Sequence, residues 1–152
     1  TMTQALETRS LYEQDTLLWI EDTVAKLKAH DFENIDLENL IEEINELGKS
    51  QKKELKSRLL VLLEHLLKRL YVDSPDDFRG WEITIREQRQ QIEIEIDDSP
   101  SLKTLWQEVF DKVWPMALKG VRKDYPRTFF PDCWPFLQDL ESILERDFWE
   151  ED

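Results

Sequence analysis

Leucine and isoleucine recur every three or four residues between Asp36 and Tyr71, and this is the most regular pattern in the chain. Such spacing places the apolar side chains along one face of an α-helix. The stripe comprises Leu37, Leu40, Ile41, Ile44, Leu47, Gln51, Leu55, Leu59, Leu62, Leu66 and Leu70. Asp36 is a suitable N-cap. The pattern predicts one long central helix over about residues 37–71, and it leaves open whether that helix kinks at Gly48.

A shorter helix is expected before the central one. Ser10 and Glu13 have the spacing of a capping box, which predicts a helix that begins at Leu11 and ends near Ala29. Residues 1–9 are expected to form a flexible N-terminal segment. The main apolar stripe of this helix is Leu17, Ile20, Val24 and Leu27, and a different side carries Asp15 and Trp19. A helix that is apolar on more than one side is expected to contact two neighbours.

Two periodicities compete between Trp81 and Ile96. Isoleucines alternate with polar residues as in a strand, but Trp81, Ile85, Gln88, Ile92 and Ile96 also follow a helical repeat. A hairpin needs turn residues between its strands, and residues 86–91 contain no Gly, Pro, Asn or Asp. The sequence therefore predicts a helix.

The remaining third of the chain predicts shorter helices and an ordered loop. Pro100 is placed to begin a helix, with a stripe that comprises Leu102, Leu105, Val109, Val113 and Met116. Pro115 lies in this pattern and predicts a kink or a break. Residues 120–132 are expected to form a loop, and Pro135 is expected to open a last short helix. The tail from Asp147 holds two aromatic residues that are expected to pack back on the body.

These elements define an all-α fold. We expect an irregular up-down bundle of four to five helices around the central helix, formed by residues 1–152 as a single domain. The composition agrees, because 40% of residues are hydrophobic, 36% are charged, and only 3 are Gly. Such a composition is typical of a folded helical protein.

Charge and cysteine content exclude several classes of function. The net charge of -14 makes binding to nucleic acid unfavourable. There is no apolar run long enough to cross a bilayer, so membrane insertion is not expected and a cytoplasmic location is. The one cysteine, Cys133, excludes a multi-cysteine zinc site, and we expect it to be a buried structural thiol.

The central helix has an uneven distribution of charge. Residues 36–46 include five acidic side chains and no basic one, whereas residues 49–69 are mainly basic. This order complements the helix dipole. It also gives the helix an end-to-end polarity that could guide an antiparallel neighbour or a symmetry mate.

Three residues are weak candidates for catalysis: His65, Glu43 and Arg86. His65 has the chemistry of a general base, but no Ser or Cys has the setting of a nucleophile, so a structural hydrogen bond is the favoured interpretation. Arg86 belongs to a polar cluster that ends at Arg89. These arginines are expected to pair with the acidic half of the central helix, and an anionic ligand is the alternative.

Acidic residues give a second, weaker hypothesis. Glu42, Glu43 and Glu46 resemble half of the magnesium site of all-helical nucleotide pyrophosphohydrolases, and Glu95 with Asp98 formally supplies the other half. Magnesium prefers oxygen ligands and leaves positions open for phosphates. On this alternative the protein would be a magnesium-dependent hydrolase, and otherwise no cofactor is expected.

Several stretches together resemble a bacterial family described as "domain of unknown function 29". They are Tyr12 to Asp15 with Trp19, Asp36 to Ile44 with Leu47, Gly48 and Ser50, Leu62 to Lys68, Trp81 with Ile85 to Arg89, Asp98 to Leu102, Phe130, Pro131 and Cys133, and Asp147 to Trp149. The resemblance implies an all-helical fold and transfers no catalytic residue. Because no complete catalytic set is found and 6 Trp and 7 Phe exceed what one small bundle needs to bury, the leading expectation is a non-catalytic helical interaction module that binds a protein partner or itself.

Overall fold

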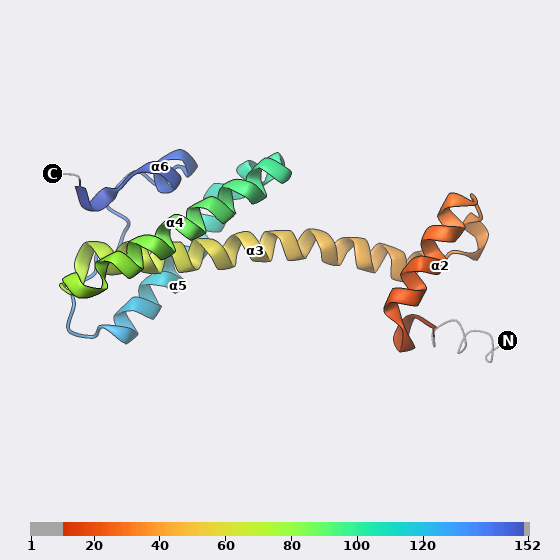
Figure 1. Cartoon of the computed structure of the whole chain (residues 1–152), viewed down its shortest axis with the longest axis horizontal. Coiled ribbons are helices and arrows are strands. Elements are labelled where there is room, and N and C mark those ends of the chain that lie inside the picture. The colour runs from red at the N-terminus through yellow and green to blue at the C-terminus, as the bar shows by residue number, and fades with distance from the viewer. Residues whose placement is uncertain (1–10, 151–152) are drawn as a thin grey trace. The chain divides into compact units, whose positions relative to one another are not determined.

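The computed structural model describes residues 11–150, and within this range it consists of helices without a strand (Figure 1). The all-α prediction is confirmed. The elements are α2 (Thr16–Lys28), η1 (Phe32–Asn34), α3 (Leu37–Tyr71), α4 (Pro75–Asp98), η2 (Pro100–Leu105), α5 (Trp106–Asp124), α6 (Leu140–Glu145) and η3 (Phe148–Glu150), where η denotes a 3-10 helix. The chain divides into two compact units, of which unit 1 ends at Ser50 and unit 2 begins at Gln51.

The central helix of the sequence analysis is α3, and it is not interrupted at Gly48. Asp36 caps it as predicted, because its Oδ1 atom accepts a hydrogen bond from the backbone N–H of Asn39 at 3.3 Å. The first turns of α3 belong to unit 1 and the remainder to unit 2. The two parts of α3 therefore have different surroundings, and they are described separately.

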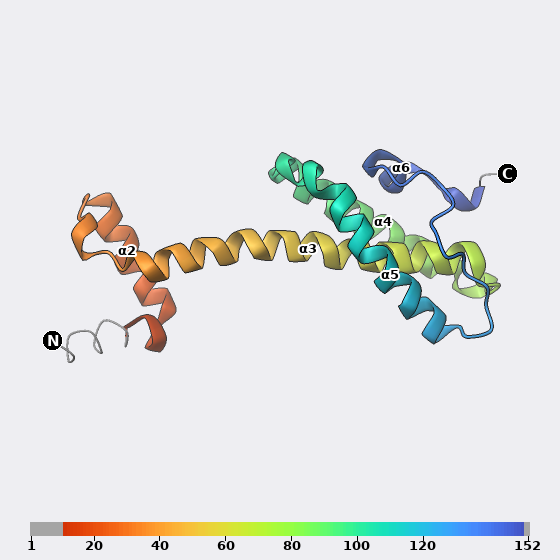
Figure 2. The same cartoon turned by 180° about the vertical axis from the view of Figure 1, so that it is seen from behind.

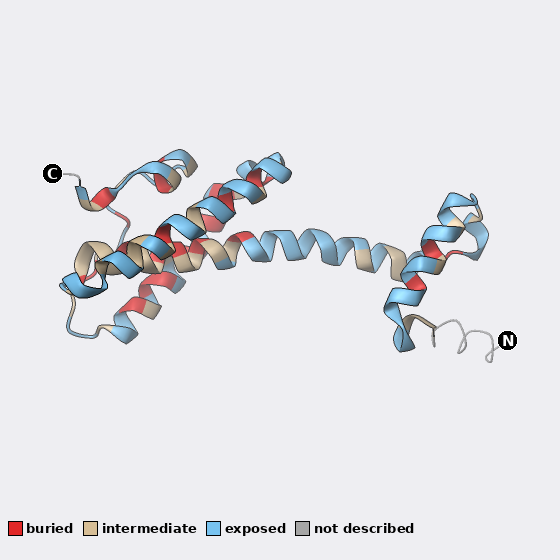
Figure 3. Cartoon of the chain, viewed as in Figure 1, coloured by how far each residue is buried: buried red, intermediate tan, exposed pale blue. Residues whose placement is uncertain are grey.

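In unit 2, α4 and α5 cross α3 (Figure 2), and the buried residues of these helices form an extensive hydrophobic core (Figure 3). Six leucines of α3 are fully buried there, with isoleucines of α4 and a stripe of α5. The α3 and α4 members are Leu55, Leu59, Leu62, Leu63, Leu66, Leu67, Ile85, Ile92 and Ile96. The helix predicted between Trp81 and Ile96 is confirmed, since its buried isoleucines follow a helical repeat. Burial on this scale, at roughly 1.5–3 kcal/mol per side chain, is the main stabilising contribution to unit 2.

The α5 region differs from its prediction at both ends. Residues 100–105 form a 3-10 helix, and α5 then continues through Pro115 to Asp124. Of the predicted kink or break at Pro115, the break is therefore wrong. The loop expected over residues 120–132 begins only after Asp124, and residues 125–132 are non-helical as predicted. Proline costs about 3 kcal/mol inside a helix, and burial of Val113, Ala117 and Val121 on either side of it offsets this cost. Met116, predicted to be in the stripe, is 57% exposed because the buried positions follow steps of four.

The last helix, α6, starts at Leu140 and not at Pro135. Asp139 sets its start, because Oδ2 of Asp139 accepts a hydrogen bond from the backbone N–H of Ser142 at 3.1 Å. A hydrogen bond from the Ser142 hydroxyl, followed by this backbone bond, lowers the pKa of Asp139. Residues 135–138 remain non-helical, and the indole N–H of Trp134 donates to the Leu137 carbonyl at 3.1 Å. The tail packs back on unit 2 as predicted, with Phe148 only 1% exposed.

The described part of unit 1 comprises a helical turn at residues 11–14, α2, η1 and the start of α3. The predicted first helix is divided at Asp15, whose Oδ1 atom caps α2 by accepting from the Leu18 N–H at 3.0 Å. A helix beginning at Leu11 and continuous to Ala29 is therefore wrong. Its proposed capping residue, Ser10, and the segment expected to be flexible lie outside the described residues.

Candidate interaction surface

The described part of unit 1 has a very small core. Its buried hydrophobic residues are Trp19 and Ile35, and Thr23 is buried beside Trp19 on α2. The Thr23 hydroxyl donates to the Trp19 carbonyl at 2.8 Å, which satisfies a polar group inside the core. The ring of Tyr12 meets Trp19 edge-on, with centroids 4.9 Å apart. The buried side of α2 is therefore the side with Trp19, and not the side with the main apolar stripe.

A hydrogen bond joins the helical turn at residues 11–14 to α3. The Tyr12 hydroxyl donates to Oε1 of Glu43, a contact between residues 31 positions apart. This bond is the main reason that the pKa of Tyr12 is raised to about 12. Glu43, one of the candidates for catalysis and for a metal site, is thus an acceptor in the packing of unit 1.

The main apolar stripe of α2 is exposed, and so is the apolar stripe at the start of α3 (Figure 3). Exposure of these side chains ranges from 39% at Leu27 to 68% at Leu47. The set, named here the two exposed stripes, comprises Leu17, Ile20, Val24 and Leu27 on α2 and Leu37, Ile41, Ile44 and Leu47 on α3. Monomeric soluble proteins rarely expose contiguous apolar patches larger than a few hundred Å², and larger ones mark interaction sites.

Acidic side chains accompany the stripe of α3. Glu38, Glu42 and Glu46 are exposed on the same segment, and no basic residue of α3 precedes Lys49. Lys49 lies 3.5 Å from Glu46, and both side chains are more than half exposed. An exposed pair of this kind contributes little to stability. The surface of unit 1 therefore combines apolar stripes with a mainly acidic α3 segment.

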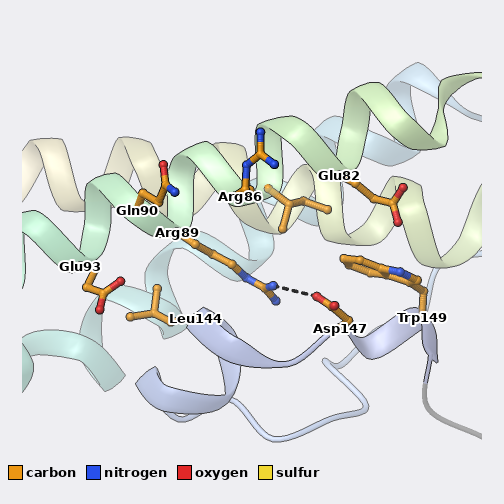
Figure 4. A pocket seen from close by; sticks show the side chains of 9 residues that line it. Glu82, Arg86, Arg89, Gln90, Glu93, Leu144, Asp147 and Trp149 are labelled. Carbon is orange, nitrogen blue, oxygen red and sulfur yellow. Dashed lines mark hydrogen bonds and ion pairs between the residues drawn. The ribbon is translucent and has the colours of Figure 1, made fainter.

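Unit 2 contains a cleft of about 380 Å³ between α4 and the C-terminal segment (Figure 4). Arg89 extends into it from α4, and each of its three guanidinium nitrogens contacts a protein oxygen. Its Nε donates to the Ile143 carbonyl at 2.9 Å, its Nη2 donates to the Arg146 carbonyl, and its Nη1 lies 3.2 Å from Oδ1 of Asp147. Burial lowers the pKa of Arg89, although Asp147 opposes this shift.

Arg89 is therefore a structural residue that holds the end of α6. The prediction that Arg89 pairs with the acidic part of α3 is wrong, because its carboxylate partner is Asp147. The sequence could not show this, because these two residues are separated by 58 positions. Arg86 is exposed, lines the same cleft and has no ion pair within residues 11–150. Trp149 also lines this cleft. The guanidinium carbon of Arg69 lies 5.1 Å from the centroid of the Trp149 ring and 3.9 Å from that of Phe78.

Two of the candidate metal ligands, Glu95 and Asp98, line a smaller cavity of about 230 Å³ together with Glu54. Oε1 of Glu95 accepts a hydrogen bond from Nε of Arg58 at 3.2 Å, and Arg58 also binds Glu54 at 2.8 Å. Burial, followed by the charge of Glu54, raises the pKa of Glu95. The sequence alone does not place Arg58 and Glu54 in this cluster, since only the packing of α3 on α4 brings them to Glu95.

The remaining candidates, Glu42, Glu43 and Glu46, belong to unit 1. Among the described residues, no group of three or more His, Cys, Asp or Glu side chains is arranged to hold a metal ion. The magnesium hypothesis is thus supported by the sequence pattern alone.

His65 makes the structural hydrogen bond that the sequence favoured. Its Nδ1 lies 2.7 Å from the Val61 carbonyl one helical turn earlier, so Nδ1 carries a proton and donates. Burial lowers the pKa of His65. Cys133, in contrast, is exposed, and the prediction of a buried thiol is wrong because the neighbouring Trp134 occupies the interior.

The described residues define a class of protein: an all-helical chain with one well-packed unit and one unit that exposes apolar stripes. Over residues 11–149 the chain matches the family model "Domain of unknown function DUF29", and it belongs to that family. No curated protein and no solved structure matched the chain. Among the helices of residues 11–150, none is long and apolar enough to cross a membrane.

Proposed function

We propose that this protein is a non-catalytic helical interaction module whose binding surface is formed by the two exposed stripes of unit 1. The observation that carries the proposal is the reversed amphipathicity of α2. Trp19 and Thr23 are buried, while the more apolar side with Ile20 and Val24 is in contact with solvent. A soluble helix normally buries its most apolar face, so this arrangement indicates a surface that is covered by a partner.

The free energy gained by burying the two exposed stripes is comparable with the entropic cost of association. Full burial of a Leu, Ile or Val side chain contributes about 1.5–3 kcal/mol, and the side chains of the two exposed stripes are roughly half exposed. Covering them would contribute on the order of 10 kcal/mol before the entropic cost of association, which is about 4–15 kcal/mol. A partner that also makes polar contacts at the rim would then bind stably.

In-cell photo-cross-linking tests this function. A benzophenone amino acid would replace Ile44 in the α3 stripe or, as a matched control, Ile94 on α4. The two side chains are similarly exposed, at 58% and 52%, but Ile94 belongs to unit 2. We expect a discrete cross-linked protein product from position 44 and none from position 94. Equal labelling at both positions, or none at position 44, would contradict the proposed function.

A further inference from the structure

We infer that the partner of the two exposed stripes is a second copy of this chain, with the α2 stripe of each copy on the α3 stripe of the other. This inference rests on the proposed function and names its partner. The stripes extend over residues 17–27 and 37–47, and each is about 15 Å long at the helical rise. Two surfaces of equal length and similar chemistry can cover each other completely.

Unit 1 needs this partner at all times in order to stay folded. The described part of unit 1, residues 11–50, buries only Trp19 and Ile35 as hydrophobic residues, and units with so small a core usually need a metal, disulfides or oligomerisation to stay folded. Cys133 lies outside unit 1, so a disulfide within unit 1 is excluded. A second copy is made together with the first and is always available at the same concentration.

The arrangement closes on itself. In a two-fold dimer the contact of α2 with α3 occurs twice, so each stripe is used once and none remains exposed. A contact between identical stripes, α3 on α3, would instead leave α2 uncovered and would bring the acidic segments of both copies together. Exposure of both stripes therefore favours the reciprocal arrangement.

Charge also favours α2 as the surface that meets α3. Five acidic residues and no basic one lie at positions 36–46, along the whole α3 stripe. The basic residues of α2, Lys26 and Lys28, lie in its last turn. Lys26 pairs with Asp22 at 2.8 Å, whereas Lys28 is exposed and has no ion pair within residues 11–150. α2 also carries Glu21 and Asp22, so its two acidic and two basic residues balance, and the acidic segment of α3 meets less like charge on α2 than it would on a second α3.

The molar mass of the purified full chain in solution tests the inference. Light scattering over a concentration series is expected to give about twice the 18.3 kDa of one chain. Ile20→Ser on α2 and Ile44→Ser on α3 should each raise the dimer Kd at least 100-fold, because each substitution acts at two symmetric contacts. Within one chain Ile20 is 42% exposed and Ile44 is 58% exposed, so each substitution removes only part of a side chain's packing inside the monomer.

The matched control is Ile94→Ser, which should change the dimer Kd less than twofold. A mass of 18.3 kDa for the unsubstituted chain at all concentrations would overturn the inference. It would also be overturned if Ile94→Ser weakened the dimer as much as Ile44→Ser, or if only one of the two stripes responded. If the chain alone is monomeric but position 44 cross-links to a different protein in cells, the proposed function stands and the second-copy inference fails.

Hydrogen exchange provides an independent measurement that does not depend on any variant. Amides of α2 should exchange at least 10-fold more slowly at high than at low protein concentration, because dimerisation and folding of unit 1 are coupled. Amides of α5, whose stripe is buried within unit 2, are the internal reference and should not respond. Protection of α2 that is independent of concentration would contradict the inference.

Discussion

Nη1 of Arg89 lies 3.2 Å from Oδ1 of Asp147, and the same guanidinium donates to the carbonyls of Ile143 and Arg146. These carbonyls are at the end of α6, where backbone acceptors lack partners within the helix. One side chain of α4 therefore supplies the cap of a helix that follows it by more than 50 residues. The interaction also fixes the start of η3, which carries the buried Phe148.

The first prediction concerns this cap. Arg89→Lys keeps the charge but loses the planar fork that reaches three acceptors, so we expect a loss of about 2 kcal/mol in the free energy of unfolding, as for buried hydrogen bonds of charged groups. Urea unfolding measures it. Arg86→Lys, on the exposed side of the same helix, should stay within about 0.5 kcal/mol of the wild type. Equal effects of the two substitutions would show that Arg89 does not hold the C-terminal segment.

The second prediction concerns Glu64 on α3. Burial raises its pKa from the usual 4.5, so the folded state binds this proton more tightly than the unfolded state. The contribution is fully present below pH 4.5 and is lost as the pH rises through the folded-state pKa. Glu64→Gln should therefore be more stable than the wild type at pH 7, and the two melting temperatures should converge below pH 4.5.

The control for Glu64 is Glu108→Gln on α5, since Glu108 is 62% exposed. Its melting temperature should differ little from that of the wild type at either pH. If Glu64→Gln lowers the melting temperature at pH 7, the carboxylate of Glu64 is stabilised by its surroundings, and burial does not dominate.

The third prediction concerns His65, whose contribution to stability changes with pH in the opposite direction to that of Glu64. Burial lowers its pKa from 6.5, so the stability that depends on the neutral ring is present above pH 6.5 and is lost as the pH falls through the folded-state pKa. His65→Asn should flatten the decline in melting temperature between pH 7 and pH 5. His30→Asn is the control, because His30 is exposed and its φ of 57° is one that Asn tolerates. A slope that His65→Asn leaves unchanged would exclude His65 as its origin.

The fourth prediction compares two glycines inside helices. A Cβ at Gly48 would meet nothing within 4 Å, so Gly48→Ala should stabilise α3 by roughly 0.5–1 kcal/mol. A Cβ at Gly120 on α5 would lie 3.3 Å from Oε1 of Glu64, and the side chain of Glu64 would have to move. Gly120→Ala should therefore raise the melting temperature less than Gly48→Ala does. A larger gain at Gly120 would show that Glu64 is not held near α5.

The sequence was sufficient where the apolar repeat was long. The repeat of α3 and the helical spacing of Ile85, Ile92 and Ile96 predicted their elements, because the period of a helix is a local property. The start of α6 was predicted at Pro135 and lies at Leu140, because Asp139 caps the helix by accepting a hydrogen bond from the Ser142 N–H. The continuation of α5 through Pro115 depends on the burial of its neighbours, and this tertiary contribution outweighs a local cost.

Surface properties were harder to predict than elements. The sequence identified the apolar stripe of α2, but it could not show that Trp19 is covered while Ile20 is exposed. Periodicity shows which residues share a face, and only the neighbours decide which face is buried. The same limit explains Arg89, whose partner is distant in sequence, and Cys133, which is exposed because Trp134 takes the interior position.

The exposure of Cys133 has a practical consequence. It is the one thiol in 152 residues, so a maleimide dye or a nitroxide would attach at one known place in unit 2 without any engineering. Energy transfer or spin–spin distances from that label to a second probe in unit 1 would report directly on how the two halves are disposed in solution.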